Sequence, residues 1–222
     1  MYIMIPKILT EVVTALKDHK IEISEKVEGE GRGGSLKDEG TIKKYLMNVF
    51  GTDVIMDVTA RRAGDILVKD YDGTIHPVNI KTSLGGTDNA TSMVGFLYAL
   101  TDIPYEKLPS SINKNKFVEL VNCHRKDISN RDYWYLCVSK TNSSEVMIRG
   151  AKQINCWVEN ANPANLLQIN WKKEKTLSGL NQSYDKAYDK IVGGIKRCII
   201  KSVLKLNPLW QEDIVNAINS QK

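Results

Sequence analysis

The spacing of apolar residues predicts two helices in the first part of the chain, separated by a glycine-rich loop. Residues 6–19 place apolar side chains at every third or fourth position, which is the spacing of one helical face. Residues 29–34 read GEGRGG, and this density of glycine predicts a flexible loop. Ser35 is suited to cap the next helix together with Asp38, and Gly51 is suited to end it.

Three runs rich in β-branched residues then predict a meander of strands, followed by a polar loop. The strands are expected at residues 54–59, 65–71 and 75–82, and the loop at residues 83–89. Asp72 and Gly73 join the second and third strands, and this dipeptide favours a tight type I′ hairpin turn.

The second half of the chain predicts further strands and two C-terminal helices, after a helix near residues 90–100. Strands are expected at residues 133–139 and 146–148, a long amphipathic helix at 181–206 and a short helix at 208–219. This order predicts an α/β protein of the α+β type, in which helices flank a central mixed sheet that contains the meander.

Length and composition fit a single folded domain that spans residues 1–222. With 42% hydrophobic and 26% charged residues, the chain is typical of a globular protein. It has no apolar run of the roughly 18 residues that a membrane span needs, and its start lacks the layout of a signal peptide. A cytoplasmic protein is therefore expected. The four cysteines form no CxxC pair, and Cys123-His124 has no partner pair at zinc-finger spacing.

The positive charge of the chain is concentrated toward its C-terminus. The net charge is +5, from 31 basic and 26 acidic residues. Residues 171–205 hold nine lysines and arginines against three acids, a local balance of +6 that leaves −1 for the remainder. A basic segment on a near-neutral body favours a polyanionic partner such as nucleic acid, although a solvated helix face is the plainer interpretation.

The residues with the clearest chemical potential lie in the predicted hairpin at residues 60–83. Asp65 opens one strand, directly after Gly64. Asn79 and Lys81 stand two residues apart on the partner strand, so their side chains share one face of the sheet. An in-register hairpin brings the Asp65 carboxylate close to that pair.

These groups suit a magnesium ion and a phosphodiester substrate. Mg²⁺ prefers oxygen ligands, and Asp65 offers a carboxylate, Asn79 an amide oxygen and Ile80 a backbone carbonyl. Lys81 is suited to polarise an attacking water and to offset charge that develops on the phosphate. Each residue also has a plainer interpretation: a strand-start acid, an edge-strand amide or a solvated sheet lysine.

Asp65 followed by Asn79-Ile80-Lys81, on a helix and meander frame, resembles the PD-(D/E)xK nuclease superfamily, and within it the type II restriction endonucleases. The resemblance covers residues 35–100. It implies a restriction-endonuclease-like fold and Mg²⁺-dependent hydrolysis of double-stranded DNA at a short palindromic site, in a prokaryotic cell. It also implies a homodimer, because a palindrome has two-fold symmetry. In the family, the first Asp and the acid of the triplet bind metal, and the Lys assists the nucleophile.

The chain departs from the family pattern at two positions. Gly64 stands where proline is frequent, and Asn79 stands where Asp or Glu is usual. With one carboxylate fewer, the site needs another acid, and Glu39 on the preceding helix is the candidate, since several members take an acid from that helix. A first-turn acid favoured by the helix dipole is the plainer interpretation of Glu39, and Asp57 is a competing ligand at a strand end.

DNA contacts are expected mainly from lysines and arginines on phosphates, with base readout from a few polar side chains. The candidates come from the glycine-rich loop, the approach to Asp65, the loop after Lys81 and the basic run before the long helix. They are Arg32, Arg61, Arg62, Ser83, Lys172, Lys173, Lys175, Ser178 and Asn181.

Three other functions remain compatible with the sequence. The chain is also compatible with a repair or recombination nuclease of the same fold, although the absence of a helicase motif argues mildly against this function. Alternatively, Asn79 marks lost catalysis in a DNA-binding protein, or the basic helix of an unrelated α/β protein binds RNA.

Overall fold

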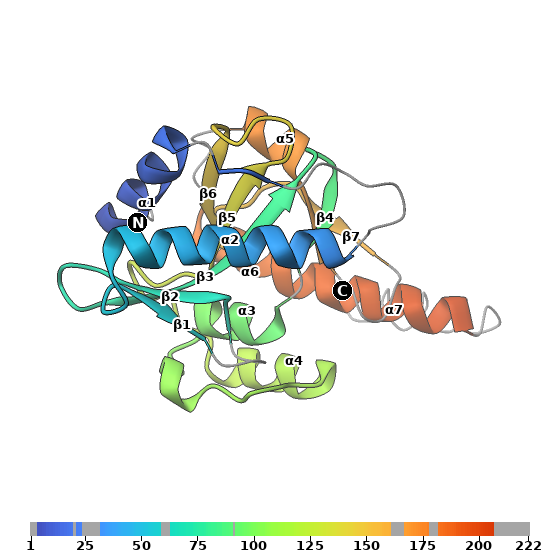
Figure 1. Ribbon diagram of the computed structural model, residues 1–222. Helices are drawn as coiled ribbons and strands as arrows, with labels where there is room; N and C mark the ends of the chain where they lie inside the picture. The colour runs from blue at the N-terminus through green and yellow to red at the C-terminus, as the bar shows by residue number, and fades with distance from the viewer. Residues whose placement is uncertain are drawn as a thin grey trace.

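The protein is a mixed α/β structure with a five-stranded mixed sheet, a three-stranded antiparallel sheet and helices packed around them (Figure 1). The computed structural model describes residues 4–19, 21–23, 32–58, 63–90, 92–160, 167–177 and 182–206, without the side chains of 32–35 and 203–206. In that part of the chain, no helix is long and apolar enough to cross a membrane.

The larger sheet has the strand order β1-β2-β3-β5-β6. Its strands are β1 (Ile55–Asp57), β2 (Ile66–Lys69), β3 (Ile75–Ser83), β5 (Trp134–Ser139) and β6 (Val146–Gly150). The first three form an antiparallel meander, β3 pairs with β5 in parallel, and β6 returns antiparallel to β5. This arrangement confirms the predicted mixed sheet with its meander.

The smaller sheet and the helices complete the fold. The smaller sheet has the order β4 (Thr87–Asn89), β8 (Leu167–Asn170) and β7 (Trp157–Glu159). The helices are α1 (Lys7–Asp18), α2 (Arg32–Phe50), α3 (Met93–Leu100), the 3₁₀ turn Tyr105–Lys107, α4 (Lys114–Cys123), α5 (Trp171–Thr176), α6 (Tyr184–Tyr188), the π-helical turn Asp189–Gly193 and α7 (Gly194–Leu206). Parallel strands require a long crossover, and β4, α3 and α4 lie in the crossover from β3 to β5.

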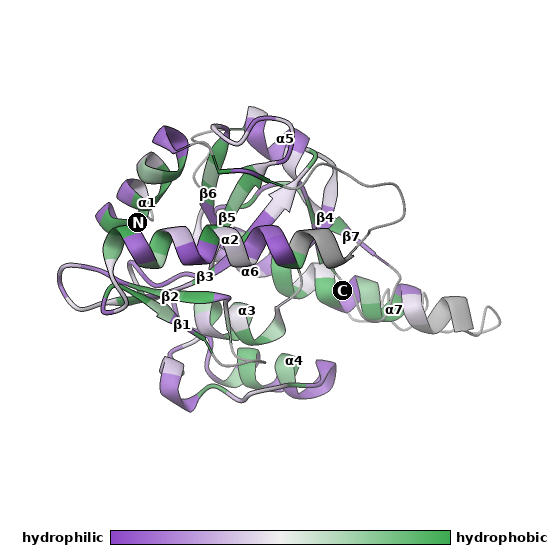
Figure 2. Ribbon diagram, in the orientation of Figure 1, coloured by the Kyte–Doolittle hydropathy of each residue, from purple (hydrophilic) through white to green (hydrophobic). Residues whose placement is uncertain are grey.

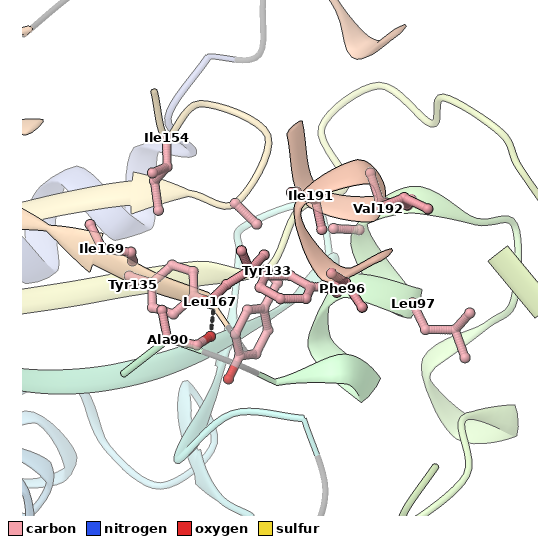
Figure 3. Close-up of a cluster of buried hydrophobic side chains, with 14 of the residues drawn as sticks. Ala90, Phe96, Leu97, Tyr133, Tyr135, Ile154, Leu167, Ile169, Ile191 and Val192 are labelled. Atoms are coloured by element: carbon pink, nitrogen blue, oxygen red, sulfur yellow. Dashed lines mark hydrogen bonds between the residues drawn. The ribbon is translucent and has the colours of Figure 1, made fainter. Parts of the chain in front are cut away.

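Alternation along β3 and β5 divides the interior into two cores on opposite faces of the sheet. Val78 and Ile80 belong to the core that the apolar faces of α1 and α2 cover, and the banded hydropathy of these helices is visible in Figure 2. Tyr133 and Tyr135 belong to the other core, with α3, α4 and the C-terminal helices. Figure 3 shows the Tyr135 hydroxyl there, donating to the carbonyl of Ala90 at 2.6 Å.

The start of α2 corrects the prediction of a loop through residue 34 with a cap at Ser35. The helix begins at Arg32, so Ser35 and Asp38 lie inside it and the proposed capping box is wrong. Glycine destabilises a helix by about 1 kcal/mol relative to alanine but can still occur within one. The prediction that the glycines end the loop only at residue 34 therefore placed the start of the helix too late. The predicted end is correct, because α2 stops at Phe50 and Gly51 adopts a φ of 81°.

The hairpin between β2 and β3 also differs from the prediction. A type I′ turn needs positive φ at both central residues, whereas Gly73 has a φ of 86° and Asp72 does not share this conformation. The loop is longer, because Asp70 donates to the Thr74 carbonyl at 2.8 Å. The Asp72 carboxylate accepts the N–H of Thr74 at 2.8 Å, which holds Asp72 in the turn.

The remaining elements largely follow the predicted pattern. The helix near residue 90 begins at Met93, where Ser92 caps it by accepting the N–H of Gly95 at 3.1 Å. The predicted loop at residues 83–89 contains the short strand β4. The long C-terminal helix is present, but a π-helical turn at Asp189–Gly193 separates α6 from α7. The predicted helix at 208–219 lies outside the described residues.

A buried carboxylate anchors the start of β5. Asp132 is fully buried and accepts the backbone N–H groups of Tyr133 at 2.8 Å and Lys152 at 3.2 Å. The Lys152 side chain is buried too, and its Nζ lies 3.2 Å from the Asp127 carboxylate. Burial raises the pKa of Asp132 to about 7, against the lowering effect of Lys152 and the backbone donors.

Asp132 should make folding stability fall with rising pH. Its folded pKa of about 7 exceeds the ordinary value of 3.8, so its stabilising contribution is complete below pH 3.8 and is lost as the pH rises through 7. The loss amounts to about 1.4 kcal/mol per pH unit within that window.

Urea unfolding from pH 4 to 8 measures this effect as a difference between Asp132→Asn and the wild type. The variant should gain stability relative to the wild type as the pH rises, whereas Asp53→Asn at an exposed turn should not. Parallel pH profiles for wild type and Asp132→Asn would contradict the assignment.

Candidate functional site

Asp65 directly precedes β2 and lies beside β3, where the pairing of these two strands ends. Its N–H donates to the Val78 carbonyl at 2.8 Å, and its Oδ2 accepts the N–H of Ile80 at 2.7 Å. Gly64 precedes it with a φ of 94°, and a Cβ there would lie 3.0 Å from the Val78 carbonyl oxygen. The close approach of Gly64 to β3 therefore fixes where the Asp65 carboxylate is presented.

Lys81 and Glu39 meet at this edge from two different elements. The Lys81 Nζ lies 3.8 Å from the Glu39 Oε1, and both side chains are mostly buried. Glu39 reaches the site from α2, whose residues Ile42 and Leu46 pack into the core one and two turns further on. Residues at these spacings share a helical face, so the core packing of α2 directs Glu39 toward the sheet.

Burial raises the pKa of both acids above their ordinary values. For Asp65 the raising effect of burial opposes the Ile80 N–H and the charges of Lys81 and Lys43. For Glu39 burial raises the pKa, Lys81 lowers it, and the charge of Asp65 raises it again. The two carboxylates are thus close enough to repel each other, and a cation between them would relieve that repulsion.

Asn79 is held by a tyrosine that the sequence did not single out. Tyr133 is buried just before β5, and its hydroxyl is hydrogen-bonded by the side chains of Asn79 and Ser92. Burial raises the pKa of the Tyr133 hydroxyl, which stays protonated at neutral pH. The Asn79 Oδ1 is buried without a hydrogen-bond partner among the described residues. A buried carbonyl oxygen without a donor is suited to bind a cation or a cation-held water.

The residues present fit a magnesium ion. Asp65 and Glu39 supply two carboxylates, and the unpartnered Asn79 Oδ1 supplies a neutral oxygen. The N–H and C=O of one residue leave a strand on the same side, so the Ile80 carbonyl faces the side on which its N–H meets Asp65. The described residues contain no cluster of three or more His, Cys, Asp or Glu side chains suited to a metal. The donor set is therefore two acids and neutral oxygens.

Further lysines surround the acids. Lys43 lies one turn after Glu39 on α2, pairs with Asp57 and lowers the pKa of Asp65. Lys140 follows β5 and lies 3.0 Å from the buried Asp38 carboxylate. Lys43 and Lys140 were not predicted as site residues. Lys43 could have been, because its spacing from Glu39 places both side chains on one face of the helix. No sequence pattern indicated Lys140, because it reaches the site only through the pairing of β3 with β5.

The competing acids have other contacts. Asp57 forms an ion pair with Lys43 at the exposed end of β1. The Asp70 carboxylate lies 3.5 Å from the buried His76 ring, at the opposite end of the hairpin from Asp65. Among the described acids of the hairpin, Asp65 is therefore the one beside Lys81.

A cavity of ≈ 470 Å³ opens at the end of β3, beyond Lys81. Ser83, Lys172 and Lys175 line it, so the structure brings together three of the predicted DNA-contacting residues. The Ser83 hydroxyl is engaged, since it bonds the Asp88 carboxylate and accepts the N–H of Gly85 at 3.1 Å.

The other predicted DNA contacts are less concentrated. Lys173 is exposed on α5, and Arg32 begins α2 with its side chain outside the described set. Arg61, Arg62, Ser178 and Asn181 lie outside the described residues. Part of the basic segment is neutralised internally, because Arg197 and Lys201 both bind Glu159, Arg197 at 2.5 Å.

No protein-family model, curated protein or solved structure matches this chain.

Loss of either acid should weaken magnesium binding without unfolding the protein. Asp65→Asn and Glu39→Gln should each reduce Mg²⁺ or Mn²⁺ affinity at least about tenfold in calorimetric titrations. The exposed Glu119 on α4 provides a matched control in Glu119→Gln. Because burial raises the pKa of both acids, protons should compete with the metal, and wild-type affinity should increase from pH 5.5 to 8. Equal affinity in all variants would exclude this site as the metal centre.

Proposed function

We propose that the protein is a type II restriction endonuclease, which uses Mg²⁺ to hydrolyse phosphodiester bonds of double-stranded DNA at a short palindromic site. The observation that carries the proposal is the convergence of Asp65, Glu39 and Lys81 at the edge of β3, on the strand that also carries Asn79. A carboxylate pair beside an ammonium group suits a metal-bound phosphate whose charge grows during attack by water.

Each residue has a distinct task in this reaction. Asp65 and Glu39 would hold the metal, with Asn79 and the Ile80 carbonyl completing the oxygen set. Bound Mg²⁺ supplies a more acidic water and charge neutralisation at the phosphate. Lys81 lies near enough to Glu39 to orient a water and to stabilise the developing charge. Tyr133 positions the Asn79 amide and does not contact the phosphate.

The fold supports the resemblance drawn from the sequence. A helix that carries Glu39 precedes a three-stranded meander, in which Asp65 stands directly before β2 and Asn79-Ile80-Lys81 lies on the neighbouring strand β3. Glu39 compensates in charge for the asparagine in the triplet. The proposed enzyme is cytoplasmic and prokaryotic, and it acts as a homodimer, because the two-fold symmetry of a palindromic target calls for two equivalent subunits.

Lys81→Ala should abolish DNA cleavage. Removal of a group that stabilises transition-state charge costs about 10²–10³ in rate, so plasmid bands cut by the wild type with Mg²⁺ should disappear. Lys69→Ala removes an exposed lysine from the neighbouring strand and should cut normally.

The products distinguish the related functions. Discrete Lys81-dependent bands support a restriction enzyme. A smear indicates a nonspecific nuclease, and cutting restricted to branched or damaged DNA indicates a repair or recombination enzyme. Binding without cleavage at any Mg²⁺ or Mn²⁺ concentration would identify a DNA-binding protein and refute the enzyme.

Asp65→Asn should separate catalysis from DNA binding. The substitution removes a charge of the metal site while preserving the shape of the side chain, so cleavage should be lost and DNA affinity in the absence of metal should stay within about threefold of the wild type, a difference of less than 1 kcal/mol. A gel-shift titration measures the affinity, and circular dichroism monitors folding. Loss of folding and binding together would make Asp65 a structural residue.

A further inference from the structure

The cavity beyond β3 lies on the same side of the sheet as Lys81. Cys137, the register partner of Lys81 on β5, lines the cavity wall. Ser83 lines it as well, two residues after Lys81. Neighbouring strands lie about 4.8 Å apart, so the cavity wall begins at Cys137, directly beside Lys81. A DNA strand whose phosphate lies at the acids would therefore place an adjacent nucleotide at the cavity mouth.

The cavity combines an apolar interior with a polar rim. Cys137, Met147 and Trp171 supply apolar surface, and Trp171 is 3% exposed, so its ring position is fixed by packing. Lys172 and Lys175 lie at the rim on α5. The hydroxyl-bearing residues Ser139, Thr141 and Thr176 and the carboxylate of Glu145 complete the lining.

This chemistry matches a nucleotide. An apolar interior accepts the faces of a planar base, and Lys172 attracts a flanking phosphate. Glu145 is paired with Lys175, and the hydroxyls of Ser139 and Thr141 bond each other, so a base edge would exchange these internal contacts for its own. The cavity volume of ≈ 470 Å³ falls within the range of about 300–1,000 Å³ typical of small-molecule sites. It accommodates one base and excludes a duplex.

An exposed leucine stands at the mouth of the same cavity. Leu84 follows Ser83, lines the cavity and is 52% exposed, so its apolar side chain is available to a ligand at the cavity. Proteins that unstack DNA often insert such a side chain where a base has left the stack.

We propose that this cavity receives one nucleobase of the DNA substrate, taken out of the stack beside the bond that is cut, while Leu84 fills the space it leaves. The inference rests on the proposed nuclease function for its substrate. It adds a base-binding site to a catalytic edge that otherwise contacts only phosphate.

Mononucleotide binding tests the cavity without any cleavage. Each of the four deoxynucleoside monophosphates is titrated calorimetrically into the protein without metal, and at least one should bind. Met147→Trp reduces the cavity and should weaken that binding at least tenfold. Asn142→Trp adds the same side chain at an exposed position outside the lining and should not. No binding to the wild type, or equal loss in both folded variants, would overturn the site.

2-Aminopurine fluorescence tests the extrusion. The fluorescent base replaces each nucleotide in turn around the cut position of a duplex, with a single strand for comparison. One duplex position should brighten severalfold with wild-type protein, and less with Met147→Trp or Leu84→Ala. Val49→Ala, at a similarly exposed position on α2, should match the wild type.

The two proposals fail in different ways. Lys81-dependent cleavage without brightening at any duplex position would overturn the base site and leave the nuclease intact. Brightening of the single strand alone would also overturn extrusion. Mononucleotide binding in a protein that cuts no DNA would refute both the nuclease and the DNA base as the natural ligand.

Discussion

The parallel pairing of β3 with β5 is the constraint on which the rest of the molecule depends. Both strands are covered on both faces, so a shift of one residue would turn Asn79 and Lys81 into the core under α1 and α2 and turn Val78 and Ile80 toward the opposite face. The observed register places Tyr133 near Asn79 and Lys140 beyond Ser83. One strand pairing thus sets the core, the polar edge and the cavity together.

Acids and lysines at this edge are paired, but the distances within the pairs differ. Lys140 lies against Asp38 at 3.0 Å, whereas Lys81 and Glu39 are 3.8 Å apart. Asp65 accepts a backbone N–H and still has a raised pKa, because burial outweighs its donors. Charge-assisted hydrogen bonds are usually shorter than about 3 Å, so Lys81 and Glu39 attract each other without a direct hydrogen bond, and their polar atoms keep bonding capacity for a ligand.

The local pattern of the sequence predicted the meander, the shared face of Asn79 and Lys81, and the proximity of Asp65, because a strand's alternation and a hairpin's pairing are set by neighbouring residues. It misplaced the start of α2 and the hairpin turn, where glycine's conformational freedom permits several outcomes. The positions of Tyr133 and Lys140 could not be predicted from local sequence, since they depend on the pairing of two strands that are separated in the chain by two α-helices.

Gly64 is one of the two positions, with Asn79, at which the chain departs from the pattern of the proposed family. Its φ of 94° is closed to proline, whose ring fixes φ near −65°. This difference is therefore one of backbone geometry rather than of metal-binding chemistry. The acid is presented by a residue in the left-handed region, which glycine adopts without the steric cost that a side chain would bring, so the position of the carboxylate depends on the absence of a side chain at its neighbour.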